Sequence, residues 1–197
     1  MAEAEDKGQP LTYGDYLTWT DGKRWEILDG QAVAMSPAPT LDHQEVVGEV
    51  FVQLANQLRG KPCRPFVAPV DVRLPRPGQS DDATDRVVQP DVLVVCDPDK
   101  LDRRGVRGAP DVVMEVLSPA TAGIDHLRKR RIYESAGVRE YWLVHPGDRT
   151  VLVYLLHDGS YGKPDVQTME APTPVQVLPE VQIDWTPIVE RLGPIEP

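Results

Sequence analysis

Cysteine, phenylalanine and long apolar runs are all scarce in this sequence of 197 residues. No stretch approaches the roughly 18 continuous apolar residues of a membrane-spanning helix, and residues 1–10 are polar and acidic, unlike a signal peptide. We therefore expect a cytoplasmic protein without a membrane segment. Cys63 and Cys96 lack the spacing of metal ligands, so we expect two free thiols rather than a disulfide or a zinc site.

Basic residues are also fewer than acidic ones. The chain has 21 Lys and Arg against 31 Asp and Glu, a net charge of −10. Proteins that bind nucleic acid tightly and without sequence preference usually present a basic surface, and this balance argues against that class. The basic residues are partly clustered, at Arg103, Arg104 and Arg107 and again over residues 128–131. A local phosphate contact is compatible with such clusters, although a solvated helix face is the ordinary explanation for residues 128–131.

What is present is the composition of one soluble globular domain, 41% hydrophobic and 26% charged. The pattern along the chain predicts an α/β (α+β) fold, a mixed β-sheet flanked by helices. Asp29-Gly30 predicts a hairpin, and apolar residues at spacings of three and four predict a helix over residues 41–59, capped by Thr40. The other predicted elements are a short helix within 11–19 capped by Thr12, strands near 64–67, 71–74, 89–95, 111–117, 141–144 and 150–156, a mobile loop over 75–88, and a second helix from 121 or 122 to about 135.

Three regions are expected along the chain. Residues 1–10 form a disordered N-terminus, and residues 11–162 form the domain. Residues 163–197 form a Pro-rich C-terminal extension that packs on the domain or on a partner subunit.

Two carboxylates lie in or beside short apolar runs bounded by proline. Asp91 follows Pro90 at the start of one Val- and Leu-rich run, and Glu115 lies near the end of the next. Such runs are typical of buried strands, where an unpaired charge is costly. Adjacent strands would deliver both carboxylates to one hard cation, Mg²⁺ or Mn²⁺. The ordinary alternative is a pair of strand-end carboxylates satisfied by arginine or backbone.

The predicted second helix supplies a positive charge. Asp125, Lys129 and Tyr133 follow one another at spacings of four along one helix face. Because this helix begins shortly after Glu115, its inward face would bring Lys129 back over the carboxylates. A lysine there could position or polarise a water that the metal activates. The alternatives are an ordinary, solvent-facing Asp125–Lys129 helix pair, and a Tyr133 that packs and forms hydrogen bonds without taking part in catalysis.

Taken together, five segments resemble the bacterial Uma-two family, restriction-endonuclease-like proteins within the PD-(D/E)XK nuclease superfamily. The segments are WEILDG at 25–30, PDV at 90–92, EVLSP at 115–119, the set Asp125, Lys129 and Tyr133, and AGVREYWLV at 136–144. They follow the family's order and cover roughly residues 11–160. Singly each motif is weak, but jointly they are specific.

The resemblance implies a restriction-endonuclease-like core in which Asp91 and Glu115 hold the metal, with the carbonyl of Val116 as a further ligand. In the superfamily a lysine usually stands two positions after the acidic residue, where this chain has Leu117. The family's lysine lies on the following helix, which indicates Lys129.

Two further residues are candidates. Glu26 matches the family's early acidic residue and would add a metal ligand or a general base, with a solvated strand residue as the alternative. His43 leans toward the buried side of the first long helix, where a structural histidine is more usual than a ligand. The expected catalytic set is Glu26, Asp91, Glu115 and Lys129, with Mg²⁺ or Mn²⁺ as cofactor.

These residues predict a Mg²⁺-dependent endonuclease that hydrolyses phosphodiester bonds in DNA. Cutting both strands needs two active sites, so a symmetric homodimer is expected. The alternative is a catalytically inactive nuclease fold used for binding or regulation, which the acidic charge and Leu117 favour. Another phosphoester is a third class of substrate, but the sequence holds no signature for it, and it has no Gly-rich phosphate-binding loop.

Overall fold

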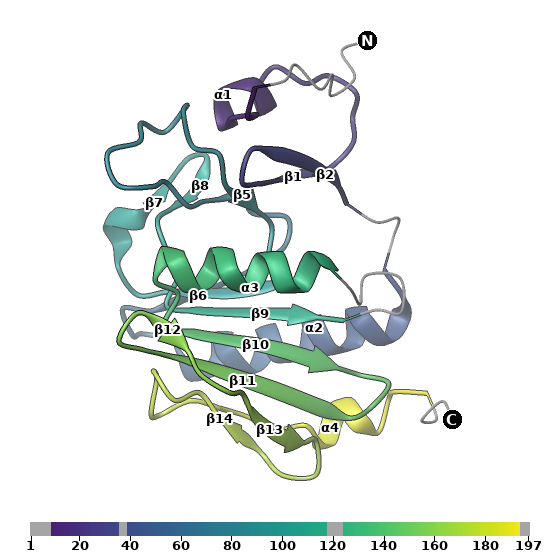
Figure 1. Cartoon of the computed structure of the whole chain (residues 1–197). Helices are drawn as coiled ribbons and strands as arrows, with labels where there is room; N and C mark the ends of the chain where they lie inside the picture. Colours follow the sequence, from purple (N-terminus) through teal and green to yellow (C-terminus); the bar gives the residue numbers. More distant parts are fainter. Residues whose placement is uncertain (1–8, 36–38, 118–123, 194–197) are drawn as a thin grey trace.

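A seven-stranded mixed sheet forms the centre of the computed structural model, which describes residues 9–35, 39–117 and 124–193 (Figure 1). Its strand order is β12-β11-β10-β9-β6-β3, and β13 pairs with β11. The strands are β3 (Arg64–Val67), β6 (Val92–Val95), β9 (Val112–Val116), β10 (Glu140–His145), β11 (Thr150–His157), β12 (Ser160–Tyr161) and β13 (Asp165–Thr168).

A second sheet of short strands lies above the first in Figure 1, in the order β2-β1-β5-β4-β8-β7. Its strands are β1 (Trp25–Leu28), β2 (Gln31–Ala34), β4 (Val72–Arg73), β5 (Val87–Val88), β7 (Leu101–Asp102) and β8 (Gly105–Arg107). A small hairpin joins β14 (Thr173–Pro174) to β15 (Gln182–Ile183). The hairpin predicted at Asp29-Gly30 is confirmed as β1–β2, with Asp29 and Gly30 both at positive φ.

Two long helices cover opposite faces of the central sheet (Figure 1). The longer, α2 (Leu41–Gln57), begins at Thr40, whose hydroxyl accepts a hydrogen bond from the N–H of His43 at 3.3 Å. Such a cap contributes about 1 kcal/mol to stability, and this helix and its predicted cap are confirmed. The other helices are α1 (Tyr13–Tyr16), α3 (Ile124–Ala136), α4 (Thr186–Val189) and the 3₁₀ turn η1 (Pro98–Lys100).

Strand β9 directs its side chains alternately to the two helices. Val112, Met114 and Val116 belong to the core cluster under α2, and Val113 belongs to the cluster under α3. Because side chains alternate along a strand, Glu115 points to the α3 face. The neighbours of β9 are β6, antiparallel to it, and β10, which is parallel and reached through α3. The predicted adjacency of the two carboxylate strands is therefore confirmed.

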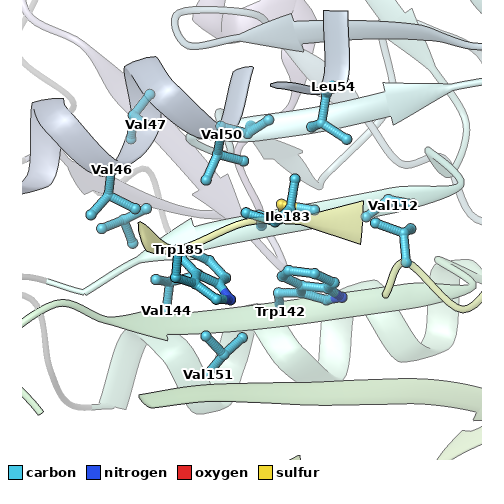
Figure 2. Close-up of a cluster of buried hydrophobic side chains, with 14 of the residues drawn as sticks. Val46, Val47, Val50, Leu54, Val112, Trp142, Val144, Val151, Ile183 and Trp185 are labelled. Carbon is cyan, nitrogen blue, oxygen red and sulfur yellow. The ribbon is translucent and has the colours of Figure 1, made fainter. Parts of the chain in front are cut away.

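The core under α2 also contains residues from the C-terminal part of the chain (Figure 2). The ring of Trp185 lies 6.3 Å from that of Trp142 in β10. Glu140 of β10 accepts hydrogen bonds from the indole of Trp142 and from the N–H of Val177. The segment is thus attached to the central sheet by polar as well as apolar contacts, and its treatment as an extension separate from residues 11–162 stays a prediction.

Two expectations are wrong. Cys63 and Cys96 form a disulfide, not free thiols, because they flank the antiparallel strands β3 and β6, where Arg64 pairs with Val95. The segment 75–88, expected to be a loop throughout, contains β5, whose two valines are fully buried. The N-terminal residues up to 8, expected to be disordered, and the predicted start of the second helix lie outside the described residues. Within the described part of the chain, no helix combines the length and apolar character needed to cross a membrane.

Candidate active site

Glu115 lies near the end of β9, beneath α3. Its side chain is 5% exposed. Its Oε1 atom accepts hydrogen bonds from Lys129 Nζ at 3.0 Å and from the Tyr133 hydroxyl at 2.7 Å. Both donors belong to α3 and are one turn apart, so a single helix face presents them to the same oxygen. The packing and hydrogen bonding expected of Tyr133 are therefore confirmed.

Glu26 reaches the same lysine from the second sheet. Its Oε1 atom lies 2.8 Å from Lys129 Nζ and accepts the backbone N–H of Gln89 at 2.8 Å. Glu26 is 5% exposed and Lys129 7%, so the exposed alternatives considered for both residues are wrong. Lys129 thus joins a carboxylate of each sheet through one buried ammonium group.

Asp91 completes the cluster from the start of β6. Since Val92 pairs with Met114 in antiparallel register, Asp91 lies opposite Glu115. Its Oδ2 atom accepts the N–H of Val116 at 2.8 Å and lies 3.2 Å from Nε2 of His43. With its side chain 20% exposed, Asp91 is the most open of the three carboxylates.

His43 orients Asp91 from the opposite side of the sheet. It occupies the first turn of α2, and its ring is mostly buried. Its Nδ1 atom has no hydrogen-bond partner in the described part of the chain. The contact with Asp91 is therefore the one polar contact of this imidazole that the described residues provide.

The buried charges shift the pKa values of the group. Burial raises the pKa of Glu115 to about 7; Lys129 opposes this shift, while Asp91 and Glu26 add to it. For Lys129, burial lowers the pKa, but Glu115 and Glu26 outweigh burial and raise the pKa above its ordinary value. Burial and then Glu115 raise the pKa of Tyr133. At neutral pH Lys129 is therefore an ammonium and Tyr133 a hydroxyl donor, and neither can accept a proton.

The donor chemistry of the cluster fits a hard divalent cation. Two carboxylates contact one ammonium and a third, Asp91, lies opposite Glu115. An added cation would offset the burial and then the repulsion from Asp91 and Glu26 that raise the pKa of Glu115. Over residues 9–35, 39–117 and 124–193, no three His, Cys, Asp or Glu side chains form a ready metal-binding group. The Lys129 ammonium contacts both Glu26 and Glu115, so in this structure these two carboxylates share a lysine cation. The predicted ligands Asp91, Glu115 and the Val116 carbonyl stay predictions.

Gln89 was not singled out from the sequence, although it immediately precedes the Pro90-Asp91 motif. Its N–H holds Glu26, its amide oxygen accepts two hydrogen bonds from Arg24, and its amide nitrogen donates to Asp71 at 2.8 Å. Only the adjoining motif could have drawn attention to it, because these partners come from two distant segments, around residues 24–26 and at Asp71.

The basic run at residues 128–131 is partly engaged within the fold. The Arg128 guanidinium donates to the side chain of Gln31, and that of Arg130 lies over the ring of Tyr154. The side chain of Asp125, placed with Lys129 by its spacing, lies outside the described features. With Lys129, three of the four basic residues in the run therefore have partners within the fold.

The amino-acid sequence matches a known protein family. The model of the Uma2 family, described as "Putative restriction endonuclease", matches residues 13–186. The chain belongs to the Uma2 family. The resemblance inferred from five short motifs is thereby confirmed. The family match includes Glu26, Asp91, Glu115 and Lys129, and it continues past residue 162 into the C-terminal segment.

Two known proteins are similar to this Uma2 family member. An uncharacterized protein of Synechocystis sp., slr1290, is 28% identical over 153 residues, which cover 75% of each chain. A crystal structure titled as a "putative nuclease belonging to DUF820" from Anabaena variabilis superimposes with a TM-score of 0.72 at 19% identity, covering 92% of this chain and 98% of that one. At that identity the match shows the fold alone, and the predicted α/β fold class is confirmed.

Proposed function

We propose that this protein is a Mg²⁺- or Mn²⁺-dependent endonuclease that hydrolyses phosphodiester bonds in DNA. The observation that carries the proposal is the buried ammonium of Lys129 between Glu26 and Glu115, beside the more open Asp91. A cluster with excess negative charge, one partly exposed carboxylate and perturbed pKa values is characteristic of a catalytic site. Membership of the Uma2 family supports the reaction class.

Each residue has a distinct role in this proposal. Asp91, Glu115 and the Val116 carbonyl would hold the cation, which would supply a lowered pKa for a water and positive charge beside the phosphodiester. Tyr133 and Lys129 fix one oxygen of Glu115, and the Val116 N–H fixes one oxygen of Asp91.

Lys129 acts as a cation in this scheme and not as a base, because its raised pKa keeps it protonated. It orients the attacking water and offsets negative charge as the bond to phosphorus breaks. Glu26, held by the N–H of Gln89, keeps the ammonium in place. Two active sites in a symmetric homodimer would allow cleavage of both strands; this assembly and a cytoplasmic location stay predictions.

The test is cleavage of plasmid DNA by Asp91→Asn and Glu115→Gln variants with Mg²⁺ or Mn²⁺. Both should lose activity by about 100-fold or more, since each removes a charged ligand from the reacting centre. Glu170→Gln, which removes the same charge at an exposed site, is the matched control and should cleave as the wild type does. Unchanged cleavage by both site variants would rule out this mechanism.

A binding or regulatory protein that retains the nuclease fold is the second candidate. Two observations favour it: Leu117 stands where the superfamily usually has lysine, and the net charge is −10. Calorimetric titration with Mn²⁺ separates the two functions. Heat of binding that Glu115→Gln abolishes, without cleavage of any nucleic acid by the wild type, would support the binding protein.

A further inference from the structure

An arginine-rich cleft opens beside the candidate active site. It encloses about 610 Å³ between the start of β1, β3 with the turn that follows it, and the β7–β8 hairpin. Four arginines and two aromatic rings contribute to its walls: Arg24, Arg64, Arg103, Arg104, Tyr16 and Phe66. This concentration of positive charge is unusual in a chain with a net charge of −10.

Most of this positive charge is free to meet a ligand. Over the described residues, Arg24, Arg64 and Arg103 form no ion pair; Arg24 donates only to the neutral amide of Gln89, and Arg64 lies over Phe66. Arg104 is 51% exposed and contacts Asp81 and Asp82 at 3.3–3.4 Å. Unpaired guanidinium groups beside one another favour an anionic ligand, phosphate above all.

The two carboxylates of the cleft already have donors. Asp102 accepts two hydrogen bonds from the buried Arg73, at 2.7 Å each, and a third from the backbone N–H of Arg104 at 2.7 Å. Asp71 accepts from Gln89 at 2.8 Å, and burial raises its pKa. The remaining arginines therefore give the cleft a net positive charge.

Two backbone contacts join the cleft to the catalytic carboxylates. Gln89 lines the cleft with its side chain while its N–H holds Glu26. Pro69 lines the cleft directly after Ala68, whose N–H donates to the carbonyl of Asp91 at 3.0 Å. The wall of the cleft is thus hydrogen-bonded to Glu26 and to the backbone of Asp91, although the catalytic side chains themselves do not line it.

The size of the cleft favours an unpaired strand over a duplex. A volume of about 610 Å³ is that of a small-molecule pocket, which accepts one or two nucleotides but not a double helix. Tyr16 and Phe66, with the apolar Val70, Leu101 and Val106, offer surfaces against which bases can pack. Arginine beside aromatic rings is the combination that proteins use to hold single-stranded nucleic acid.

We propose that this cleft binds an unpaired nucleic-acid segment through its phosphates and bases and leads it to Asp91 and Glu115. The inference rests on the proposed function, since it assigns the cleft to the substrate strand. It narrows that function to a nuclease that prefers single-stranded, frayed or flipped-out DNA.

The experiment is fluorescence anisotropy with the full chain in EDTA, which prevents cleavage. The probes are a fluorescein-labelled single-stranded DNA oligonucleotide, the same oligonucleotide with abasic positions, and its duplex. We expect the single strand to bind most tightly. The Arg64→Ala/Arg103→Ala variant should bind it on the order of tenfold more weakly, with a salt dependence lower by about 1.4 in log–log slope, because two phosphate contacts are lost.

Single-charge variants provide the matched comparison. Arg103→Ala and Lys163→Ala each remove one positive charge, and Lys163 follows β12, at the edge of the central sheet opposite β3. Arg103→Ala should weaken binding and Lys163→Ala should not. Circular dichroism of each variant checks that the fold is retained.

Several outcomes would overturn the inference: no binding by the wild type, equal losses in Arg103→Ala and Lys163→Ala, or equal affinity for duplex and single strand. Equal affinity for the abasic probe would overturn the assignment of bases to the cleft. Failure of the proposed function is separate. If the protein binds single strands through the cleft but never cleaves them with Mg²⁺ or Mn²⁺, the inference about the cleft stands and the proposed nuclease function is wrong.

Discussion

Lys129 is the residue on which the electrostatics of the site depend. Its ammonium is the only cation within contact of Glu26 or Glu115 in the described part of the chain. Both carboxylates are nearly fully buried, so solvent does little to screen their charge. The position of Lys129 therefore decides both the stability and the protonation of the cluster.

Replacing Lys129 by Met should destabilise the metal-free protein. The change leaves two buried carboxylates without a counter-charge, and breaking a buried pair in this way costs about 3–5 kcal/mol. Urea unfolding in EDTA measures the loss. Adding Glu115→Gln to Lys129→Met should restore part of it, because one of the two unpaired charges is then removed.

Arg131→Met is the control for this change. Arg131 is an exposed cation on the same helix, and such substitutions usually alter stability by no more than about 0.5 kcal/mol. If the Lys129→Met variant has the same free energy of unfolding as Arg131→Met, the Lys129 ammonium does not stabilise the carboxylate cluster in solution.

At the level of elements, strands β3 and β6 are joined twice, by their ladder and by the disulfide. Cys63 immediately precedes β3 and Cys96 immediately follows β6, and the two strands run antiparallel. The disulfide therefore fastens one end of the strand pair whose other end carries Asp91. Strand β3 is the edge strand of the central sheet, where the ladder has a single partner.

Replacing both cysteines by alanine should lower the free energy of unfolding by about 3–4 kcal/mol, the value expected for a cross-link spanning 33 residues. Urea unfolding of the wild type with and without reductant, beside the Cys63→Ala/Cys96→Ala variant, measures this. Reductant should shift the wild type and leave the variant unchanged. Alkylation of both thiols in unfolded, unreduced protein would contradict the disulfide.

At the scale of the whole molecule, the C-terminal segment supplies part of the main core. The residues it contributes to the cluster under α2 are Met169, Val175, Val181, Ile183, Trp185 and Ile188. The side chains of Gln53 and Gln57 in α2 also donate to the carbonyls of Asp184 and Gln182. The C-terminal segment therefore packs against α2 through both apolar and polar contacts.

Truncation after Gly162 should prevent stable folding. At about 1.5–3 kcal/mol for each fully buried apolar side chain, the six core residues contribute on the order of 10 kcal/mol, which is comparable to the whole stability of a domain. The expected result is loss of the cooperative thermal transition, measured by circular dichroism. Truncation after Gly193 is the control and should retain it. A truncated chain at 162 that unfolds cooperatively would make residues 11–162 an independent domain.

Features that depend on near neighbours could be predicted from the amino-acid sequence alone. The hairpin at Asp29-Gly30, the cap at Thr40, the α2 periodicity and the two carboxylate strands follow from turn chemistry and from spacings of two or of three and four. The family could also be recognised from the sequence, because its motifs are short segments of neighbouring residues in a fixed order.

Contacts between residues far apart in the sequence became known from the folded structure. Glu26 comes from β1 and Lys129 from α3, the cysteines are joined across an antiparallel pair, and the cleft takes its arginines from separate segments. No periodicity records such contacts, because they depend on how finished elements pack against one another. The free thiols expected from sequence were wrong for this reason: the pairing of β3 with β6 determines the distance between the cysteines, and their spacing in the sequence does not.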